Sequence, residues 1–202
     1  MSLSPAYVGS GPYCYANSLA MVLGPDSPDP SVIEVLTGSP FGFWMLGGTT
    51  PFFDPPGWDA IIGLNAAIDL LGWECDRTVG GSEVLAMERL RQASRHAPVL
   101  AGPVELGLLL LLHHPGAGTA IGSDHCLVVT EVEEDMVRFH GHPHATLPSS
   151  AFAAARQAET IAYSPKRGWW AHSSTRWSKT TGPRPSRCCG GLLPPTGTWQ
   201  RC

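Results

Sequence analysis

The stretch GPYCYANSLAMVLG, residues 11–24, is the starting point for interpreting this chain. Apolar residues recur at helical spacing behind Cys14, and Gly24 is a suitable stop, so the stretch predicts a helix that begins near the cysteine. The first turn of a helix has unpaired N–H groups and the positive end of the helix dipole, and both favour a thiolate over a thiol. Cys14 is therefore a candidate nucleophile. The alternative is a small buried side chain, the usual place of a single cysteine.

A candidate base follows much later in the chain. Residues 123–132, SDHCLVVTEV, predict a buried strand that begins at or beside His125, and residues 136–140 predict its hairpin partner. A histidine at the mouth of a buried strand can face a helix N-terminus from another layer. A cysteine early on a helix with a histidine later on a strand is also the order found in papain-like enzymes. The alternative for His125 is a bond to a backbone carbonyl at the strand end.

Helices come first in the remaining pattern, and strands cluster late, which predicts an α+β fold. Helices are expected at 30–37, 58–71, 82–95 and 148–157, and further strands at 73–79, 98–104 and 159–163. The helix after Ser82 is expected to bury Val84, Leu85, Met87 and Leu90. Residues 39–57 are rich in Gly, Pro and aromatic residues, and predict a long apolar loop that shapes a cleft or lies over the core.

Composition divides the chain into a body, residues 1–163, and a tail, residues 164–202. The 202-residue chain is 43% hydrophobic, enough for one large core. The tail holds seven basic and no acidic residues, so it carries +7 and the body −11. It has no Val, Ile or Met and no periodic apolar face, which predicts disorder or translation of a shifted reading frame. Binding of nucleic acid or of an acidic partner is the less favoured alternative.

The same composition limits partners and compartment. No basic and apolar signal segment begins the chain, and the longest apolar stretch, 99–112, is short for a bilayer. Six cysteines in a chain of this length do not predict a disulfide scaffold, so a reducing cytoplasm is expected. No glycine-rich phosphate loop follows a strand, which argues against a nucleotide. We expect no cofactor, no nucleic acid and no membrane as partners.

The histidine-rich segment HGHPH, residues 140–144, supports a rival interpretation as a zinc or other divalent metal site, since alternate residues of an extended strand face one side. The candidate ligands are His140, His142 and His144, with His113, His114 or His125 in addition. The glycine and the proline interrupt a regular strand, and no carboxylate stands at motif spacing. Solvated loop histidines, with no metal, are the favoured interpretation.

Residues 13–19, YCYANSL, together with SVIE at 31–34 and the segment 38–43, resemble the N-terminal domain of the butirosin biosynthesis protein H family. They are similar more distantly to the bacteriocin-leader peptidases fused to ABC transporters, which share a papain-like core. The resemblance covers about residues 10–163. It implies a papain-like fold in which N-terminal helices that carry the cysteine pack on a late antiparallel sheet that carries the histidine.

The resemblance implies that Cys14 takes an acyl group from a thioester or amide and that His125 acts as base and then acid. We therefore expect cysteine-dependent acyl transfer or cyclisation in secondary-metabolite biosynthesis. The donor is expected to be an acyl group on a carrier protein or CoA, and the acceptor a small molecule. A cysteine peptidase or amidase of the same fold is one alternative, and a non-catalytic binding protein is another. The apolar segment 39–57 suits an acyl chain better than a peptide backbone.

The chain departs from the leader peptidases at two places. They have an Asp-Pro dipeptide on the strand after the histidine, and the matching dipeptide here is His142-Pro143. A neutral histidine orients an imidazolium less well than a carboxylate does, so Glu105 or a backbone carbonyl is a possible substitute. The peptidases also carry a Gln upstream of the cysteine, which this chain lacks. The remaining oxyanion candidates beside the Cys14 N–H are Ser10, Tyr7 and Asn17, the last of which has a structural role as its alternative.

Overall fold

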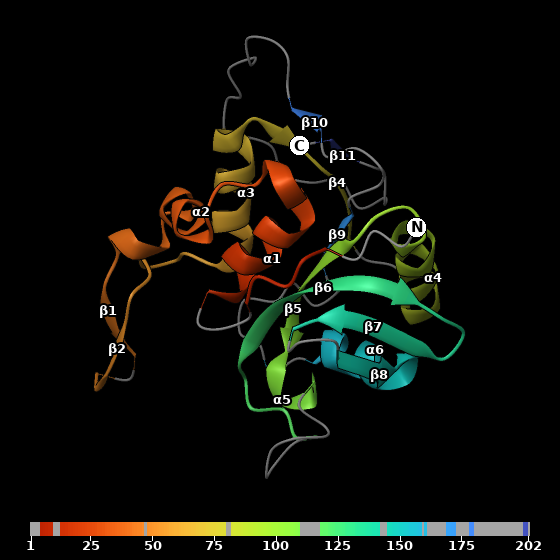
Figure 1. The fold of residues 1–202 in the computed structure, drawn as a ribbon. Coiled ribbons are helices and arrows are strands. Elements are labelled where there is room, and N and C mark those ends of the chain that lie inside the picture. The colour runs from red at the N-terminus through yellow and green to blue at the C-terminus, as the bar shows by residue number, and fades with distance from the viewer. Residues whose placement is uncertain are drawn as a thin grey trace.

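An antiparallel sheet forms the centre of the structure (Figure 1), a computed structural model that describes residues 5–9, 13–46, 48–79, 82–109, 118–141, 145–158, 160, 169–172, 178–179 and 200–201. The central strands are β5 (Val99–Glu105), β6 (Asp124–Val132), β7 (Met136–His140) and β8 (Ala145–Pro148). Each of them pairs antiparallel with the next. Helices precede most of these strands, so the structure confirms the α+β class.

Three helices cover one face of β5 and β6: α1 (Cys14–Leu23), α2 (Pro30–Thr37) and α3 (Ala60–Leu71). The helix predicted around the cysteine is confirmed, and it ends at Gly24 with φ of 64°. Asp29 caps α2, because its Oδ1 accepts a hydrogen bond from the Ser31 N–H at 2.9 Å. The Glu34 carboxylate of α2 accepts a hydrogen bond from the Tyr15 hydroxyl of α1.

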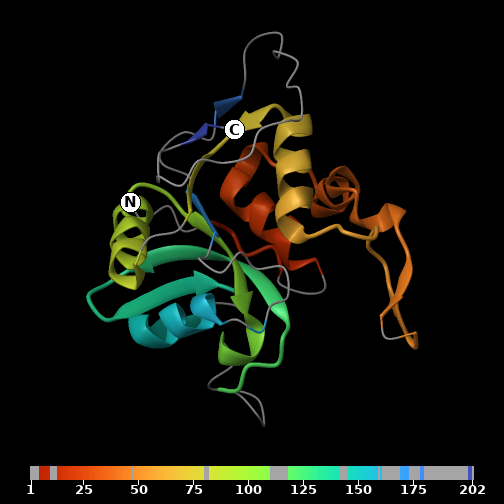
Figure 2. The same cartoon turned by 180° about the vertical axis from the view of Figure 1, so that it is seen from behind.

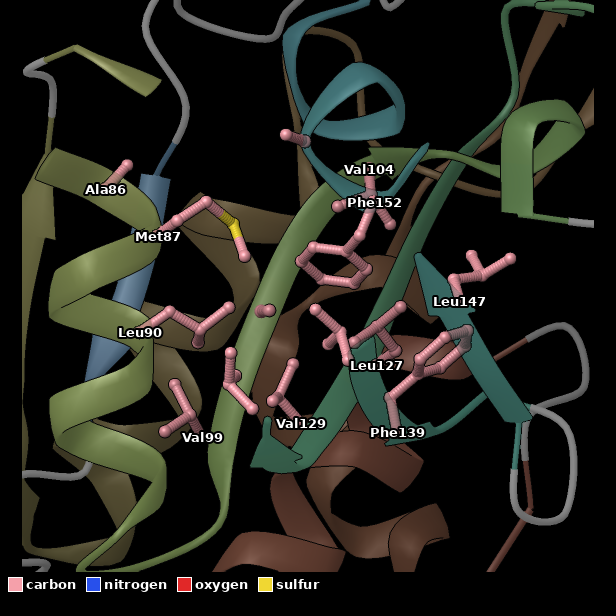
Figure 3. Close-up of a cluster of buried hydrophobic side chains, with 14 of the residues drawn as sticks. Ala86, Met87, Leu90, Val99, Val104, Leu127, Val129, Phe139, Leu147 and Phe152 are labelled. Carbon is pink, nitrogen blue, oxygen red and sulfur yellow. The ribbon is translucent and has the colours of Figure 1, made fainter. Parts of the chain in front are cut away.

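The helices α4 (Glu83–Ser94) and α6 (Ser149–Gln157) cover the opposite face of the sheet, as the view from behind also shows (Figure 2). The predicted buried side of α4 is wrong in part, because Val84 is 79% exposed and Leu85 is 43% exposed. The structure buries Ala86 and Ala93 in their place, beside Met87 and Leu90. Small side chains at these two positions let the helix lie close to the sheet. This apolar cluster is drawn in Figure 3.

The two cores draw on alternate residues of the same strands. Val99 and Ala101 of β5 and Leu127 of β6 point to α4 and α6. Leu100 of β5 and Cys126 of β6 belong to the cluster with α1 and α3. Successive side chains of a strand point to opposite faces, so one hairpin supplies both cores.

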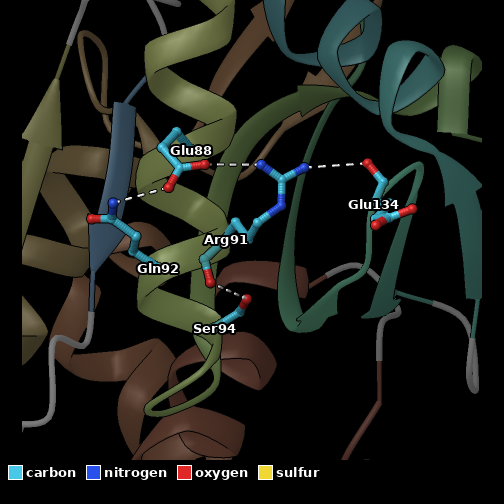
Figure 4. Close-up of polar contacts among 5 residues, drawn as sticks. All are labelled: Glu88, Arg91, Gln92, Ser94 and Glu134. Carbon is cyan, nitrogen blue, oxygen red and sulfur yellow. Dashed lines mark hydrogen bonds and ion pairs between the residues drawn. The ribbon is translucent and has the colours of Figure 1, made fainter.

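Polar contacts fix the exposed side of α4 to the turn between β6 and β7 (Figure 4). The Arg91 guanidinium bridges the Glu88 carboxylate at 3.0 Å and the Glu134 carbonyl at 3.2 Å. The same Glu88 accepts a hydrogen bond from the Gln92 amide, and the Ser94 hydroxyl donates to the Arg91 carbonyl. The bond from Arg91 to Glu134 joins α4 to this turn, whereas the other three bonds lie within the helix.

Residues 39–57 form a projecting hairpin rather than a layer over the core (Figure 1). It comprises η2 (Ser39–Phe41), β1 (Trp44–Leu46) and β2 (Thr50–Phe52), with the strands antiparallel. Phe41 is 74% exposed, and Phe43 and Phe53 are 58% and 66% exposed. The last two pack on each other with ring centroids 5.6 Å apart. Pairing of the strands with each other satisfies the backbone and leaves the aromatic side chains on the surface.

The predicted strand 73–79 is interrupted at Cys75, giving β3 (Trp73–Glu74) and β4 (Asp76–Val79). Short segments of the tail pair with the body as β9 (Trp169–His172), β10 (Ser178–Lys179) and β11 (Gln200–Arg201). The sheet order is β11-β4-β9-β5-β6-β7-β8. The predictions for the rest of the tail, and for most of the strand at 159–163, lie outside the described residues. Within the described ranges, no helix is long and apolar enough to cross a bilayer.

Candidate functional site

Cys14 is the first residue of α1, where the sequence predicted it. Tyr13 is the N-cap residue and makes no side-chain capping bond, so the first-turn N–H groups receive no cap from it. The Cys14 side chain is 7% exposed and lies in the core that α1 shares with β6. The positive electrostatic potential at a helix N-terminus favours the thiolate form of such a thiol. Because the side chain is nearly buried, little water surrounds it.

A β-bulge lies beside the start of β6, which brings His125 and Cys126 to the site. Ala101 pairs with Leu127, and Val104 pairs with His125, so two residues of β5 oppose the single residue Cys126. Gly102 is one of the two, and a Cβ there would lie 2.7 Å from the Cys126 sulfur. A bulge re-aims neighbouring side chains, and this one lies where β6 meets the N-terminus of α1.

Cys126 is the main neighbour that lowers the pKa of the Cys14 thiol. The Cys126 backbone N–H donates to the Cys14 sulfur at 3.3 Å. A hydrogen bond from the Cys126 thiol lowers the pKa of Cys14 most, burial raises it, and the hydrogen bond and charge of His125 lower it further. The net pKa of Cys14 lies well below the ordinary thiol value, whereas the pKa of Cys126 is raised well above it. These hydrogen bonds and the helix N-terminus therefore favour ionisation of Cys14 over ionisation of Cys126.

His125 lies beside Cys14, since the hydrogen bond and the charge of His125 lower the pKa of the Cys14 thiol. Its side chain is 6% exposed, and its Nε2 atom has no hydrogen-bond partner among the residues that the structure describes. A buried ring nitrogen without a partner is costly in a merely structural histidine. One imidazole nitrogen thus remains available for a proton or for a substrate atom.

Glu105 is a loop anchor and does not orient His125. Its carboxylate oxygens accept hydrogen bonds from the N–H groups of Gly107, Ile121 and Gly122, at 3.2, 2.7 and 3.2 Å, and from the Thr160 hydroxyl at 2.7 Å. These four bonds occupy the lone pairs that a carboxylate offers. Burial raises the pKa of Glu105, but the hydrogen bonds outweigh it and hold the pKa below its usual value. The prediction that Glu105 replaces the missing carboxylate and orients His125 is therefore wrong.

Asn17, another predicted site residue, packs against the segment before α1. Its side-chain nitrogen Nδ2 would lie 3.4 Å from a Cβ atom added at Gly9. Tyr7 packs its ring on His140, with centroids 5.9 Å apart. The oxyanion roles of Asn17 and Tyr7 stay predictions. Ser10 and His142 lie outside the described residues, so their roles stay predictions.

A polar network behind Cys14 was not anticipated from the sequence. The Tyr15 hydroxyl donates to the Glu34 carboxylate at 2.6 Å, and Ser39 donates to Asp54. Burial raises the pKa of Glu34, and the negative charges at Asp54 and Cys14 raise it further. A hydrogen bond between Ser39 and Glu34 joins the two pairs, so the network ties the base of the projecting hairpin to Tyr15, the residue after Cys14. No spacing rule links a helix tyrosine to a carboxylate nineteen residues later.

No group of three or more potential metal ligands occurs within the part of the chain that the structure describes. His140 is buried at the end of β7. The other candidate ligands of the histidine-rich segment, together with His113 and His114, lie outside that part.

Comparison with known proteins gives one distant relative. The chain is 29% identical over 163 residues to the uncharacterized protein YobF of Bacillus subtilis (strain 168), a match that covers 78% of this chain and 52% of that protein. The chain thus spans about half the length of the curated relative that it matches. No family model matches the chain. No solved structure matches it either.

Proposed function

We propose that this protein is a papain-like cysteine acyltransferase or cyclase that acts on an acyl thioester of a carrier protein or CoA. The observation that supports this most is the state of Cys14. Its sulfur stands at a helix N-terminus, accepts a hydrogen bond from Cys126 and is next to His125, and its pKa is well below that of a free thiol. Such a thiolate is the nucleophile that thioester exchange needs.

In the acylation step, the Cys14 thiolate attacks the thioester carbonyl. The carbon–sulfur bond to the carrier or CoA breaks, and His125 supplies the proton that the leaving thiol takes. The first-turn N–H of Cys14 has no partner within the helix, so it can donate to the developing oxyanion. The product of this step is an acyl group on Cys14 and a free carrier thiol.

In the transfer step, a nucleophile of the acceptor attacks the acyl carbonyl. His125 removes the acceptor's proton as the bond forms, and Cys14 leaves as a thiolate. The same steps with a nucleophile from within the acyl chain give a cyclic product. Because the described residues include no carboxylate that orients His125, we expect the imidazole to be held mainly by burial and by Cys14.

The projecting hairpin supports an acyl donor over a peptide. No charged residue stands between Pro40 and Phe53, and Phe41, Phe43 and Phe53 are exposed. Its base is bonded through Ser39, Asp54 and the buried network to α1. An exposed apolar surface that is anchored near the nucleophile suits an alkyl or polyketide chain, which gains about 0.8 kcal/mol for each buried CH₂.

The test is intact-protein mass spectrometry after incubation of the reduced full chain with a panel of acyl thioesters and acyl-CoA. We expect an acyl adduct in wild type, no adduct in Cys14→Ala, and an unchanged adduct in the matched control Cys75→Ser. An adduct that survives in Cys14→Ala contradicts the proposal, as does the absence of any adduct in wild type. Turnover to free acid with no acceptor present would instead identify the hydrolase of the same fold.

A further inference from the structure

Cys126 is a second buried thiol, and the proposed acyl transfer uses it only as a hydrogen-bond donor. It is 2% exposed and lies in the same core as Cys14. Both cysteines are free thiols in this structure. One is nucleophilic and the other is its direct neighbour, which is the arrangement of a reactive thiol and a resolving thiol.

The geometry brings the two side chains within reach of each other. The Cys126 backbone nitrogen is 3.3 Å from the Cys14 sulfur, and the N–Cα bond is about 1.46 Å, so the Cα of Cys126 lies within about 5 Å of that sulfur. The Cys126 thiol also hydrogen-bonds Cys14. A disulfide needs Cα atoms that are close and Cβ atoms that converge. The 3.3 Å contact between the Cys126 backbone nitrogen and the Cys14 sulfur places the two residues close enough for this bond with little movement of the backbone.

Packing holds the Cys126 sulfur in this position. A Cβ at Gly102 would lie 2.7 Å from the sulfur and 3.1 Å from the Cys126 Cα, so the space beside the bulge fits the thiol only when residue 102 is glycine. The sulfur therefore has backbone on the β5 side and α1 on the other, where Cys14 begins the helix.

We propose that Cys14 and Cys126 form a reversible disulfide when the protein meets a hydroperoxide. The Cys14 thiolate attacks the peroxide, the O–O bond breaks, and Cys14 becomes a sulfenic acid as hydroxide or an alkoxide leaves. The Cys126 sulfur then attacks the Cys14 sulfur and the S–O bond breaks. The thiol proton leaves with the hydroxide as water, and the two thiols together have given two electrons to the peroxide. A dithiol reductant restores both thiols by exchange.

The disulfide stops the nucleophile from reacting and prevents its irreversible oxidation to a sulfinic acid. That consequence rests on the proposed acyl transfer, because it concerns the same nucleophile. The bond itself requires only that Cys14 is oxidised first and that Cys126 is the thiol that resolves it.

The test treats the reduced full chain with hydrogen peroxide, blocks the remaining thiols with N-ethylmaleimide and maps the peptides by mass spectrometry. We expect a peptide that links Cys14 to Cys126 and that disappears after dithiothreitol, while Cys75 carries the maleimide in the same sample. In Cys126→Ser, Cys14 should instead be trapped by dimedone as a sulfenic acid and proceed to a sulfinic acid. Cys75→Ser should form the same link as wild type.

Oxidation of wild-type Cys14 to a sulfinic acid without the linked peptide overturns the proposal. A link from Cys14 to another cysteine, or no oxidation of Cys14, overturns it as well. The decisive measurement is made on wild type, so it does not depend on the folding of a variant. Acylation is measured separately on reduced protein, so a chain that forms the link but takes no acyl group contradicts only the proposed function.

Discussion

The two faces of the central sheet are built from neighbouring residues of the same strands and differ in chemistry. The face toward α4 and α6 holds a continuous apolar cluster that includes Phe139 and Phe152. The face toward α1, α2 and α3 holds Cys14, Cys75 and Cys126 in its core, with Glu34 buried beside it. The difference indicates that the apolar cluster supplies much of the stability, and that the other face can carry a reactive thiol because it does not bear the whole core.

Removal of a large side chain from the apolar face should have the largest effect on stability. Phe152 is fully buried and packs on Phe139, with ring centroids 5.9 Å apart. We expect Phe152→Ala to lower the free energy of unfolding by about 3–5 kcal/mol, measured by urea denaturation. In native buffer, the pH midpoint for alkylation of Cys14 should stay where it is in wild type. A shifted midpoint would show that the two faces are coupled.

The loop anchor at Glu105 should give the next largest effect, and one that depends on pH. Glu105→Gln leaves donors of the segment 107–122 without a carboxylate, which should cost about 1–3 kcal/mol at neutral pH. The pKa of Glu105 is lowered in the folded protein, so its contribution is present above the unfolded value of about 4.3 and is lost as the pH falls through the folded pKa.

The stability difference between wild type and Glu105→Gln should therefore close in acid, as pH-dependent denaturation would measure. A difference that is constant from neutral pH to acid would contradict the role of the charge. Glu88→Gln is the matched control, since Glu88 is a solvent-accessible carboxylate on α4 whose loss should change stability much less than the loss of the Glu105 carboxylate.

On the reactive face, Cys126→Ala should raise the pH midpoint for iodoacetamide alkylation of Cys14 toward the free value of about 8.5. The Cys126 thiol is the largest of the contributions that lower the pKa of Cys14, and the alanine removes it while the backbone N–H remains. A rise of one pH unit corresponds to about 1.4 kcal/mol. Alkylation followed over a pH series measures the shift, and an unchanged midpoint would remove Cys126 from the site.

His125→Gln should also raise the same midpoint, because the hydrogen bond and the charge of His125 both lower the pKa of Cys14. Acyl transfer should fall further in His125→Gln than in Cys126→Ala, because proton transfer by a positioned base contributes about 10²–10⁴-fold. Single-turnover acylation beside the alkylation series separates the two effects. Equal acylation rates in the two variants would contradict the role of His125 as base.

Cys75→Ser should have the smallest effect of this series on the reactivity of Cys14. Cys75 lies in the same core as the other two cysteines, but it is not among the main groups that shift the pKa of Cys14. The alkylation midpoint of Cys14 should match that of wild type within error. A large shift would mean that any polar change in this core perturbs the thiol, and would weaken the assignment to Cys126 and His125.

Local patterns predicted most of the elements around the site. The helix at Cys14, the strand at His125 and the start of the helix after Ser82 follow from residues close together in the chain. The errors arose where packing between distant elements decides. Which face of α4 is exposed, and whether residues 39–57 project from the core, depend on the elements that pack against them. The spacing of apolar residues along the sequence does not identify those elements.

The sequence by itself determined that a cysteine begins a helix and that a histidine begins a buried strand, because helix starts and strand periodicity are local properties of the backbone. Only the tertiary structure decided which groups surround that cysteine. On a regular strand Cys126 would face away from the layer that His125 faces, yet both act on Cys14, beside the point where β5 bulges at Gly102. Tertiary contacts likewise assigned Glu105 to its loop and not to His125, because a carboxylate bonds the donors that folding places nearest to it.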